Sequence, residues 1–213
     1  ALWTRRLYSP LEIPTQPLEG ANVFTPEDVF AGRVAGDRLL VFDYDNYYLG
    51  GAIAEHLANQ KKNVSYATPA GHASAWTFMT NELPYVYQAL ERAGVSIHTT
   101  TNLIGFDAGV ARLENLFHRA PLGINVDGVV IVGHRDPNDA LYNTVLGSDD
   151  GNSLPPMSLI GDAMAPGAIV HAVHSGHSFA RGLVDDNAAY LRDEPVTLPE
   201  PAPAFDHIRD AKS

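Results

Sequence analysis

The stretch Met157–Val170 contains the residue pattern in this chain that most suggests a binding site. An apolar run leads into Gly161-Asp162, and an alanine-rich segment then continues to Ala180. This pattern predicts a buried strand that stops at a turn and a helix that begins beyond it. In such an arrangement the amide groups of the helix N-terminus attract phosphate, and the aspartate can accept a hydrogen bond from a sugar hydroxyl. A Gly-Asp pair also caps helices for structural reasons alone, so a nucleotide site and a plain helix cap both stay open.

A second acidic turn follows the apolar run Arg38–Asp43. A dinucleotide-binding fingerprint would place glycines between such a strand and the next helix. Counted back from Glu55, the glycine slots of that fingerprint contain Asp45, Tyr47 and Gly50. The tyrosine side chain takes the space through which a pyrophosphate approaches the backbone, and the aspartate repels phosphate charge. We therefore expect a unit of Rossmann-like shape that does not bind a nicotinamide nucleotide.

The same turn also resembles the nucleophile loop of haloacid dehalogenase-type phosphatases. In that chemistry one aspartate attacks phosphorus and a second acts as acid and base beside Mg²⁺. Asp43 and Asp45 would take these roles, and Gly161-Asp162 would provide the acidic metal loop. The reaction also needs a lysine to stabilise the phosphoryl intermediate, and no lysine occurs between Asn63 and Asp210. A phosphatase is therefore an alternative function for which the sequence lacks the required lysine.

Two other groups of potential metal ligands favour structural roles. His171, His174 and His177 recur every three residues, which spreads them around a helix, whereas metal ligands on one helix prefer positions i and i+4. We expect these histidines at a domain contact or on the solvated face rather than around zinc. Asp149-Asp150-Gly151-Asn152 resembles the start of a calcium loop, but it lacks the alternating ligands and the terminal glutamate. We expect a turn there.

Four aromatic residues lie close together in the sequence at Trp76, Phe78, Tyr85 and Tyr87. They could form an aromatic box, but packing in the core or at an interface is the more common role of such residues. No Ser-His-Asp pattern with a nucleophile elbow is present. We therefore expect no catalytic residue and no metal ligand in this chain.

The composition restricts the classes of function. The 213 residues are 45% hydrophobic and 18% charged, with 18 glycines and 15 prolines, which suits a loop-rich α/β protein. A formal net charge of -11 argues against nucleic acid and anionic membranes as partners. The sequence contains no apolar run of membrane-span length and no signal-peptide pattern, so we expect a cytoplasmic protein. The absence of cysteine excludes disulfides, thiolate catalysis and cysteine-ligated clusters from this chain.

The hydrophobic period alternates between that of strands and that of helices, which predicts a parallel sheet with crossover helices and an antiparallel meander. The strands expected in the parallel sheet are Arg38–Asp43, Asn63–Thr68, Val95–Thr99 and Asp127–Gly133. The helices expected between them begin near Leu49 and span Asn81–Ala93. The meander is expected over Asn102–Phe106 and Val110–Phe117.

The domain boundaries follow from these elements. Residues 1–35 are expected to be a proline-rich linker with a short helix capped by Thr25, and residues 36–133 a degenerate nicotinamide-like domain. Residues 134–193 supply a turn of helix at Ala140–Leu146, one strand and one helix, and residues 194–213 form an extended tail. One strand and one helix do not bury a core, so the third segment must pair with another part of a protein.

The order of these pieces resembles that of flavoproteins with two dinucleotide-binding domains. Thr25–Val29 is similar to their linker, Asp127–Arg135 to the strand that returns to the flavin domain, and Leu159–Ala163 to their second FAD or ADP signature. The most similar group is the trimethylamine, dimethylamine and histamine dehydrogenase family, which is related to 2,4-dienoyl-CoA reductase and to old-yellow-enzyme-type NADH:flavin oxidoreductases. The residues that carry this resemblance are the glycine-poor turn Asp45–Tyr48, the stretch Gly161–Pro166 and Ser175-Gly176-His177.

The resemblance implies a fold and a set of partners. The fold class is α/β, a Rossmann-like FAD/NAD(P)-binding-type domain plus part of a second nucleotide-binding domain. Gly161, Asp162 and Ala163 would bind ADP or FAD, while FMN and a 4Fe-4S cluster would lie on an N-terminal barrel that this chain does not contain. The chain would then be a proteolytic fragment or one subunit of a split oxidoreductase. The barrel portion, further copies in a homo-oligomer and an electron-transfer protein would be its partners.

Overall fold

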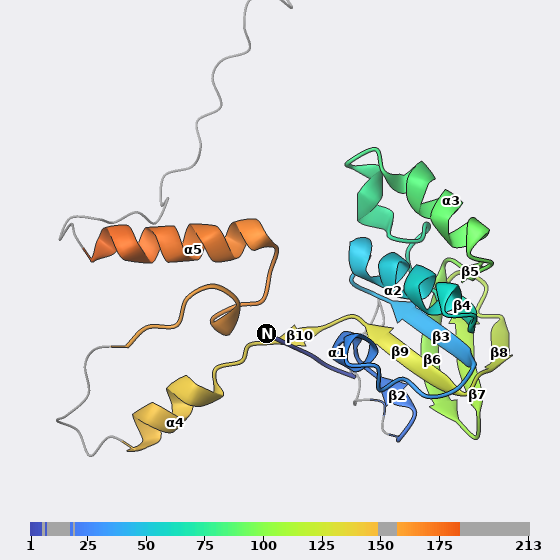
Figure 1. Cartoon of the computed structure of the whole chain (residues 1–213), viewed down its shortest axis with the longest axis horizontal. Coiled ribbons are helices and arrows are strands. Elements are labelled where there is room, and N and C mark those ends of the chain that lie inside the picture. The colour runs from blue at the N-terminus through green and yellow to red at the C-terminus, as the bar shows by residue number, and fades with distance from the viewer. Residues whose placement is uncertain (6, 8–17, 19, 149–156, 184–213) are drawn as a thin grey trace, which may run out of the picture.

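The computed structural model describes residues 1–5, 7, 18, 20–148 and 157–183. Most of them form a body of three layers, in which a parallel sheet lies between a layer of helices and an antiparallel sheet (Figure 1). The remaining helices, α4 (Ala140–Ser148) and α5 (Ile169–Gly182), lie outside this body (Figure 1).

The central layer is a five-stranded sheet in which all strands are parallel. The order of the strands across it is β2 (Val23–Phe24), β9 (Gly128–Val132), β3 (Arg38–Asp43), β4 (Asn63–Ala67) and β5 (Ser96–His98). Continuous apolar runs form β3 and β9 because each is covered on both faces, and every residue of β9 is buried. The four predicted strands are thereby confirmed. The edge strand β2 was not predicted, because two residues give no period.

Helices α1 (Pro26–Phe30), α2 (Tyr48–Asn59) and α3 (Leu83–Arg92) and the 3₁₀ turn η1 (Ala75–Phe78) belong to the helical layer. Ile53 and Leu57 of α2 and Leu90 of α3 pack with side chains from one face of the sheet. The predicted helices are confirmed. The expected cap of α1 is present as well, since the Asp28 carboxylate accepts the Thr25 amide proton at 2.9 Å.

The antiparallel sheet covers the opposite face of the parallel sheet. It contains β6 (Thr101–Asp107), β7 (Val110–Asn115) and β8 (Pro121–Asn125), paired in that order. Leu103 and Leu113 pack there with Phe42 of the central sheet. The predicted pair of strands is confirmed, but β8 was missed. Proline and glycine occupy two of its five positions and most of it is exposed, so it lacks the apolar alternation that identifies a strand.

A two-stranded ladder leads away from the body. In it β1 (Leu2–Trp3) pairs antiparallel with β10 (Arg135–Asp136), and the Thr4 amide donates to the His134 carbonyl at 2.9 Å. The guanidinium of Arg135 lies 5.1 Å from the centre of the Trp3 ring. These strands pair residues far apart in the sequence, so no local period predicts them. The segment expected to be a linker therefore contributes strands to two sheets.

The part of the chain beyond β10 differs from its prediction. Helix α4 is present and longer than the expected turn, and α5 follows the 3₁₀ turn η2 (Gly161–Ala163). Residues 157–160, however, form no strand, and the prediction of a buried strand before Gly161 is wrong. A strand needs a neighbour for its backbone hydrogen bonds, and the described chain supplies none beside these residues.

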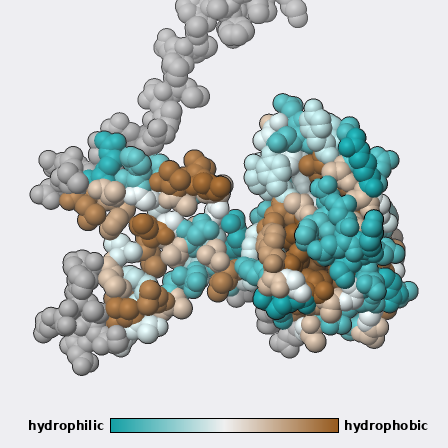
Figure 2. All heavy atoms as spheres, in the orientation of Figure 1, coloured by the Kyte–Doolittle hydropathy of each residue, from teal (hydrophilic) through white to brown (hydrophobic). Residues whose placement is uncertain are grey.

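The same region leaves apolar side chains exposed. Ile169 is 85% exposed and Leu141 is 77% exposed, and hydrophobic surface covers the first turn of α5 (Figure 2). The calcium-like sequence Asp149–Asn152 and the tail 194–213 lie outside the described residues.

Candidate functional site

The turn Gly161-Asp162-Ala163 packs against α5. Gly161 has a φ of 57°, a left-handed conformation that favours glycine, and its amide donates to Ser175 Oγ at 3.0 Å. Its carbonyl accepts the amide protons of Met164 and Ala165, each at 3.0 Å. The sequence pattern at Gly161 is thus explained by a tight turn, whose position is fixed by the helix that follows.

Asp162 lies at the outer side of this turn with its side chain 39% exposed. Its Oδ1 accepts the Gly167 amide proton at 3.3 Å, and its Oδ2 lies 3.9 Å from Arg135 Nη1. The carboxylate therefore steadies the chain just before α5 and still faces solvent. The helix-cap and nucleotide interpretations are compatible, because Oδ1 takes the hydrogen bond at the helix start, while Oδ2 lies 3.9 Å from Arg135 in a side chain that is 39% exposed.

The N-terminus of α5 starts beside this carboxylate. The Ala168 amide donates to His171 Nδ1 at 3.1 Å, and the first turn of the helix contains no acidic residue. Amide groups in a first helical turn have no acceptor within the helix, and the helix dipole adds positive potential there. With Arg135 close to Asp162, this corner offers a hydroxyl acceptor beside an anion-attracting helix end.

His171, His174 and His177 are all exposed residues of α5. His171 uses Nδ1 to accept the Ala168 amide proton, and no group of three or more potential metal ligands occurs within residues 20–148 and 157–183. His171 is therefore part of the start of α5.

The acidic turn after β3 is closed by its own side chains. Asp43 is completely buried, and its carboxylate accepts the Asn46 amide proton at 3.0 Å and a short hydrogen bond from the Tyr66 hydroxyl. Burial raises the pKa of the Asp43 carboxyl to about 7, although both hydrogen bonds act in the opposite direction. A Cβ at Gly50 would overlap this carboxyl group. Gly50 thus makes room for the buried side chain of Asp43. In a nucleotide-binding unit, the glycine at this place instead lets the backbone approach a ligand.

This geometry gives no support to the phosphatase alternative. A nucleophile must reach the phosphorus atom of a bound ester, and no atom of Asp43 is accessible. The neighbouring Asp45 lies partly within the same turn, where burial raises its pKa and the charge of Arg135 opposes that rise. The two aspartates therefore differ in environment, but neither has the lysine that the reaction needs.

The four aromatic residues separate into two environments. Tyr87 packs against the core, and its hydroxyl accepts the Ala73 amide proton at 3.2 Å. Trp76, Phe78 and Tyr85 are exposed by 59%, 62% and 69%, so they do not pack in the core, and the interface role expected as the other possibility stays a prediction. Trp76 and Phe78 lie in the 3₁₀ turn η1, and Tyr85 and Tyr87 lie in α3, so no single helical period runs through the four residues. Their spacing in the sequence therefore does not separate Tyr87 from the three exposed rings.

The three layers define an α/β domain of the FAD/NAD(P)-binding type, and the turn η2 and helix α5 follow it in the chain. No protein-family model matches the chain. Dimethylamine dehydrogenase of Hyphomicrobium sp. (strain x) is 27% identical over 197 residues, which cover 80% of this chain and 27% of that protein.

Two solved structures extend this relationship. Histamine dehydrogenase from Rhizobium sp. 4-9 superposes with a TM-score of 0.80 and 28% identity, over 93% of this chain and 32% of that one. The 6-hydroxypseudooxynicotine amine oxidase of Pseudomonas geniculata N1 gives a TM-score of 0.71 and 30% identity, over 76% of this chain and 25% of that one. The chain is similar to these proteins over most of its length, so the resemblance to the trimethylamine, dimethylamine and histamine dehydrogenase group stated from the sequence is confirmed.

The chain spans only 27% of the length of dimethylamine dehydrogenase and 32% of that of histamine dehydrogenase. In the relatives this region is therefore part of a much larger polypeptide. No helix in the described part of the chain has the length and apolar character needed to cross a membrane.

Proposed function

We propose that this chain is the nucleotide-domain portion of an FMN- and iron–sulfur-dependent amine oxidoreductase. In this proposal the chain contains no catalytic residue, and it serves as scaffold, subunit contact and one side of an ADP or FAD site. The observation that carries the proposal is the match to histamine dehydrogenase over 93% of this chain but 32% of that one. FMN and a 4Fe-4S cluster would belong to the polypeptide that completes the protein.

Asp162 and the start of α5 fit one side of a bound ADP or FAD. The half-exposed carboxylate of Asp162 can accept a hydrogen bond from a ribose or ribityl hydroxyl, and the first-turn amides of α5 attract phosphate. Gly161 and Ala163 form the turn that brings these groups together. The glycine-rich loop that would hold the other side of the phosphates is absent from the sequence, so the nucleotide would bind the chain alone only weakly.

Exposed apolar residues support a partner polypeptide for the segment 134–193. Val170 is 65% exposed and Met164 55% exposed, on either side of the proposed nucleotide corner. A domain normally covers such side chains with a second layer of secondary structure. We propose that the barrel-bearing portion of the protein, in the same chain or as a subunit, supplies that layer. A homo-oligomer and an electron-transfer protein remain part of the proposal as further partners.

Residues 36–133 would act as scaffold. The β3–α2 turn is filled by Asp43, and Tyr47 occupies a slot that needs glycine for pyrophosphate to approach. We therefore expect no NADH binding in the micromolar range by the 213-residue chain, as measured by isothermal titration calorimetry. Saturable micromolar binding of NADH would contradict a degenerate nicotinamide-like domain.

The nucleotide role is tested in the complete protein. Asp162→Asn retains the size of the side chain, but replaces the charged acceptor for a ribose hydroxyl. A hydrogen bond to a charged group contributes about 1.5–3 kcal/mol, so we expect roughly ten- to a hundredfold weaker retention of ADP or FAD. Asp107→Asn, on the far β6–β7 turn, is the matched control and leaves retention unchanged. Equal retention by the Asp162 and Asp107 variants would remove Asp162 from the site.

The mass of the natural polypeptide separates the family proposal from a stand-alone binding module. A relative of this kind predicts an intact mass about three to four times 23.0 kDa, or a complex of that mass, with flavin bound. A natural protein of 23.0 kDa that purifies alone and without flavin would support the stand-alone module instead.

A further inference from the structure

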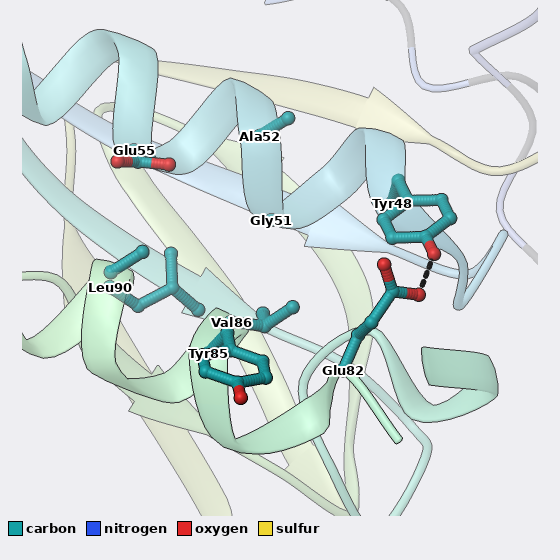
Figure 3. A pocket seen from close by; sticks show the side chains of 9 residues that line it. Tyr48, Gly51, Ala52, Glu55, Glu82, Tyr85, Val86 and Leu90 are labelled. Carbon is teal, nitrogen blue, oxygen red and sulfur yellow. Dashed lines mark hydrogen bonds between the residues drawn. The ribbon is translucent and has the colours of Figure 1, made fainter. Parts of the chain in front are cut away.

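A cleft of about 380 Å³ opens between α2 and α3, on the side of the helices away from the sheet (Figure 3). Its volume is in the range that holds a small molecule. Tyr48 and Glu55 of α2, Glu82 at the start of α3 and Tyr85 within α3 form its walls, while Val86 and Leu90 form an apolar base. None of these residues belongs to the turn proposed to bind ADP or FAD.

Helical spacing places these groups in the cleft. On α2 the lining residues follow positions i, i+3, i+4 and i+7 from Tyr48 to Glu55, and the same spacing runs from Glu82 to Ala89 on α3. Residues at this spacing lie on one face of a helix. The two middle positions on α2 are Gly51, where an added Cβ would meet Ser74 Oγ at 2.7 Å, and Ala52, whose small side chain leaves room that a larger residue would fill. The sequence thus provides two facing stripes, each with one acid and one tyrosine.

The cleft has negative charge without a positive partner. None of the residues that line it is basic, and Glu55 and Glu82 form no ion pair with any described residue. The Oε2 atom of Glu82 accepts short hydrogen bonds from the Tyr48 hydroxyl and from Thr80 Oγ1. Its Oε1 atom has no hydrogen-bond donor among the described residues and faces the space between the helices (Figure 3). This carboxylate is therefore held in place with one oxygen available to a ligand.

Two aromatic rings complete the walls. The hydrogen bond to Glu82 fixes the orientation of the Tyr48 ring, which lies on the α2 side, and the Tyr85 ring lies across from it on α3 (Figure 3). Tyr48 is 39% exposed and Tyr85 69% exposed, so part of each side chain is accessible, although the Tyr47 ring lies 4.3 Å from the Tyr48 ring. The face of an aromatic ring attracts a cation, and the attraction is strongest where water is partly excluded.

This combination selects the chemistry of the ligand. Mg²⁺ and Ca²⁺ need at least six oxygen ligands in a compact shell, and the apolar base and the small number of carboxylates do not provide one. An organic cation instead needs a negative charge nearby, aromatic faces and apolar contact for its alkyl groups. We propose that the α2–α3 cleft binds a small organic cation, a protonated or quaternary alkylamine. This proposal stands apart from the nucleotide role of Asp162, because the two sites share no residue.

Titration of the isotope-labelled 213-residue chain, followed by amide NMR, tests the proposal. The probe is tetramethylammonium chloride, and the neutral control is tert-butanol, which has a similar size and no charge. We expect saturable shifts at Gly51, Ala52 and Val86 with a Kd on the order of millimolar for the cation, weakened by added salt. We expect no saturation for the alcohol. Equal responses to both probes, or no saturable shift at the cleft, would overturn the proposal.

Substitutions in the walls of the cleft separate the contribution of the negative charge to binding from that of the aromatic rings. Tyr85→Leu removes an exposed ring and Glu82→Gln removes a charge, and each is expected to weaken binding of tetramethylammonium by about two- to fivefold. Glu91→Gln is the matched control, since Glu91 is an exposed residue of α3 that does not line the cleft. Circular dichroism identifies any variant that fails to fold. If Glu91→Gln weakened binding as much as Glu82→Gln, net charge alone would explain the effect and the cleft would not be a site.

Discussion

The layered body and the segment 157–183 use similar residues with opposite results. Leu39 and Val41 in β3 are completely buried, whereas Ile169 and Val173 in α5 are 85% and 60% exposed. Both regions have the apolar patterns of core elements. The body is closed because helices cover one face of its sheet and strands cover the other, while α5 contacts chiefly the short turn η2. An apolar pattern therefore specifies the need for a partner layer, and that partner can lie outside the described residues.

The largest expected effect contrasts a core residue with an exposed one of similar character. Phe42→Ala removes a ring that is 1% exposed and should lower the free energy of unfolding by about 3–5 kcal/mol. Ile169→Ala, at a residue 85% exposed, should change it by less than about 0.5 kcal/mol in the chain alone. Urea denaturation followed by circular dichroism measures both. A large loss from Ile169→Ala would mean that α5 packs against the body in solution.

The free energy of unfolding of the body should depend on pH because Asp43 is buried in it, an effect that fully exposed carboxylates do not produce. The pKa of Asp43 is raised to about 7 by burial, so the folded state binds a proton that the unfolded state has released. Its contribution to stability is therefore fully present below the unfolded pKa near 4 and is lost as pH rises towards about 7.

Asp43→Asn tests this dependence because the amide is neutral at every pH. The difference in unfolding free energy between wild type and variant should change by roughly 1 kcal/mol or more between about pH 5 and 8, with the variant gaining relative stability at the alkaline end. Parallel urea titrations at a series of pH values give this difference. A constant difference would show that Asp43 does not titrate in this range.

Glycines in the two regions should respond to alanine with opposite signs. Gly50→Ala places a Cβ against the Asp43 carboxyl and should cost about 1–3 kcal/mol. Gly176 lies in the interior of α5 with no atom near the added Cβ, so Gly176→Ala should stabilise the helix by about 0.5–1 kcal/mol. Thermal unfolding monitored by circular dichroism tests the first variant, and helix content before the main transition tests the second. Equal tolerance at both sites would contradict the close contact at Gly50.

The smallest expected effect lies in the ladder that connects the regions. Trp3→Leu retains an apolar residue in β1 and removes the ring beneath Arg135, which should cost about 0.5–1 kcal/mol locally. The Thr4 amide, which donates to His134, should then exchange with solvent about two- to fivefold faster. Hydrogen exchange measured by NMR checks this change, with the Val41 amide of the central strand as the unaffected reference. Acceleration at both amides would indicate global rather than local destabilisation.

Most of the body could be predicted from local sequence, and its closing elements could not. The runs Arg38–Asp43 and Asp127–Gly133 have the composition of buried parallel strands, and the helical period from Leu49 marks α2. The strands β1, β2 and β10 have two residues each, and β8 is mostly exposed. Such elements exist because another strand offers hydrogen bonds to them, and that partner is distant in the sequence.

The candidate sites divide in the same way. The local residue pattern is enough to predict that the turn after β3 lacks the glycines of a dinucleotide site, and that Gly161-Asp162 precedes a helix. The same pattern does not predict that Asp43 is buried beneath Gly50, that Trp76, Phe78 and Tyr85 face solvent, or that residues 157–160 form no strand. Residue type and spacing fix what a segment can do locally. Burial, exposure and strand pairing depend on which other segments cover it, and those neighbours are set by the fold as a whole.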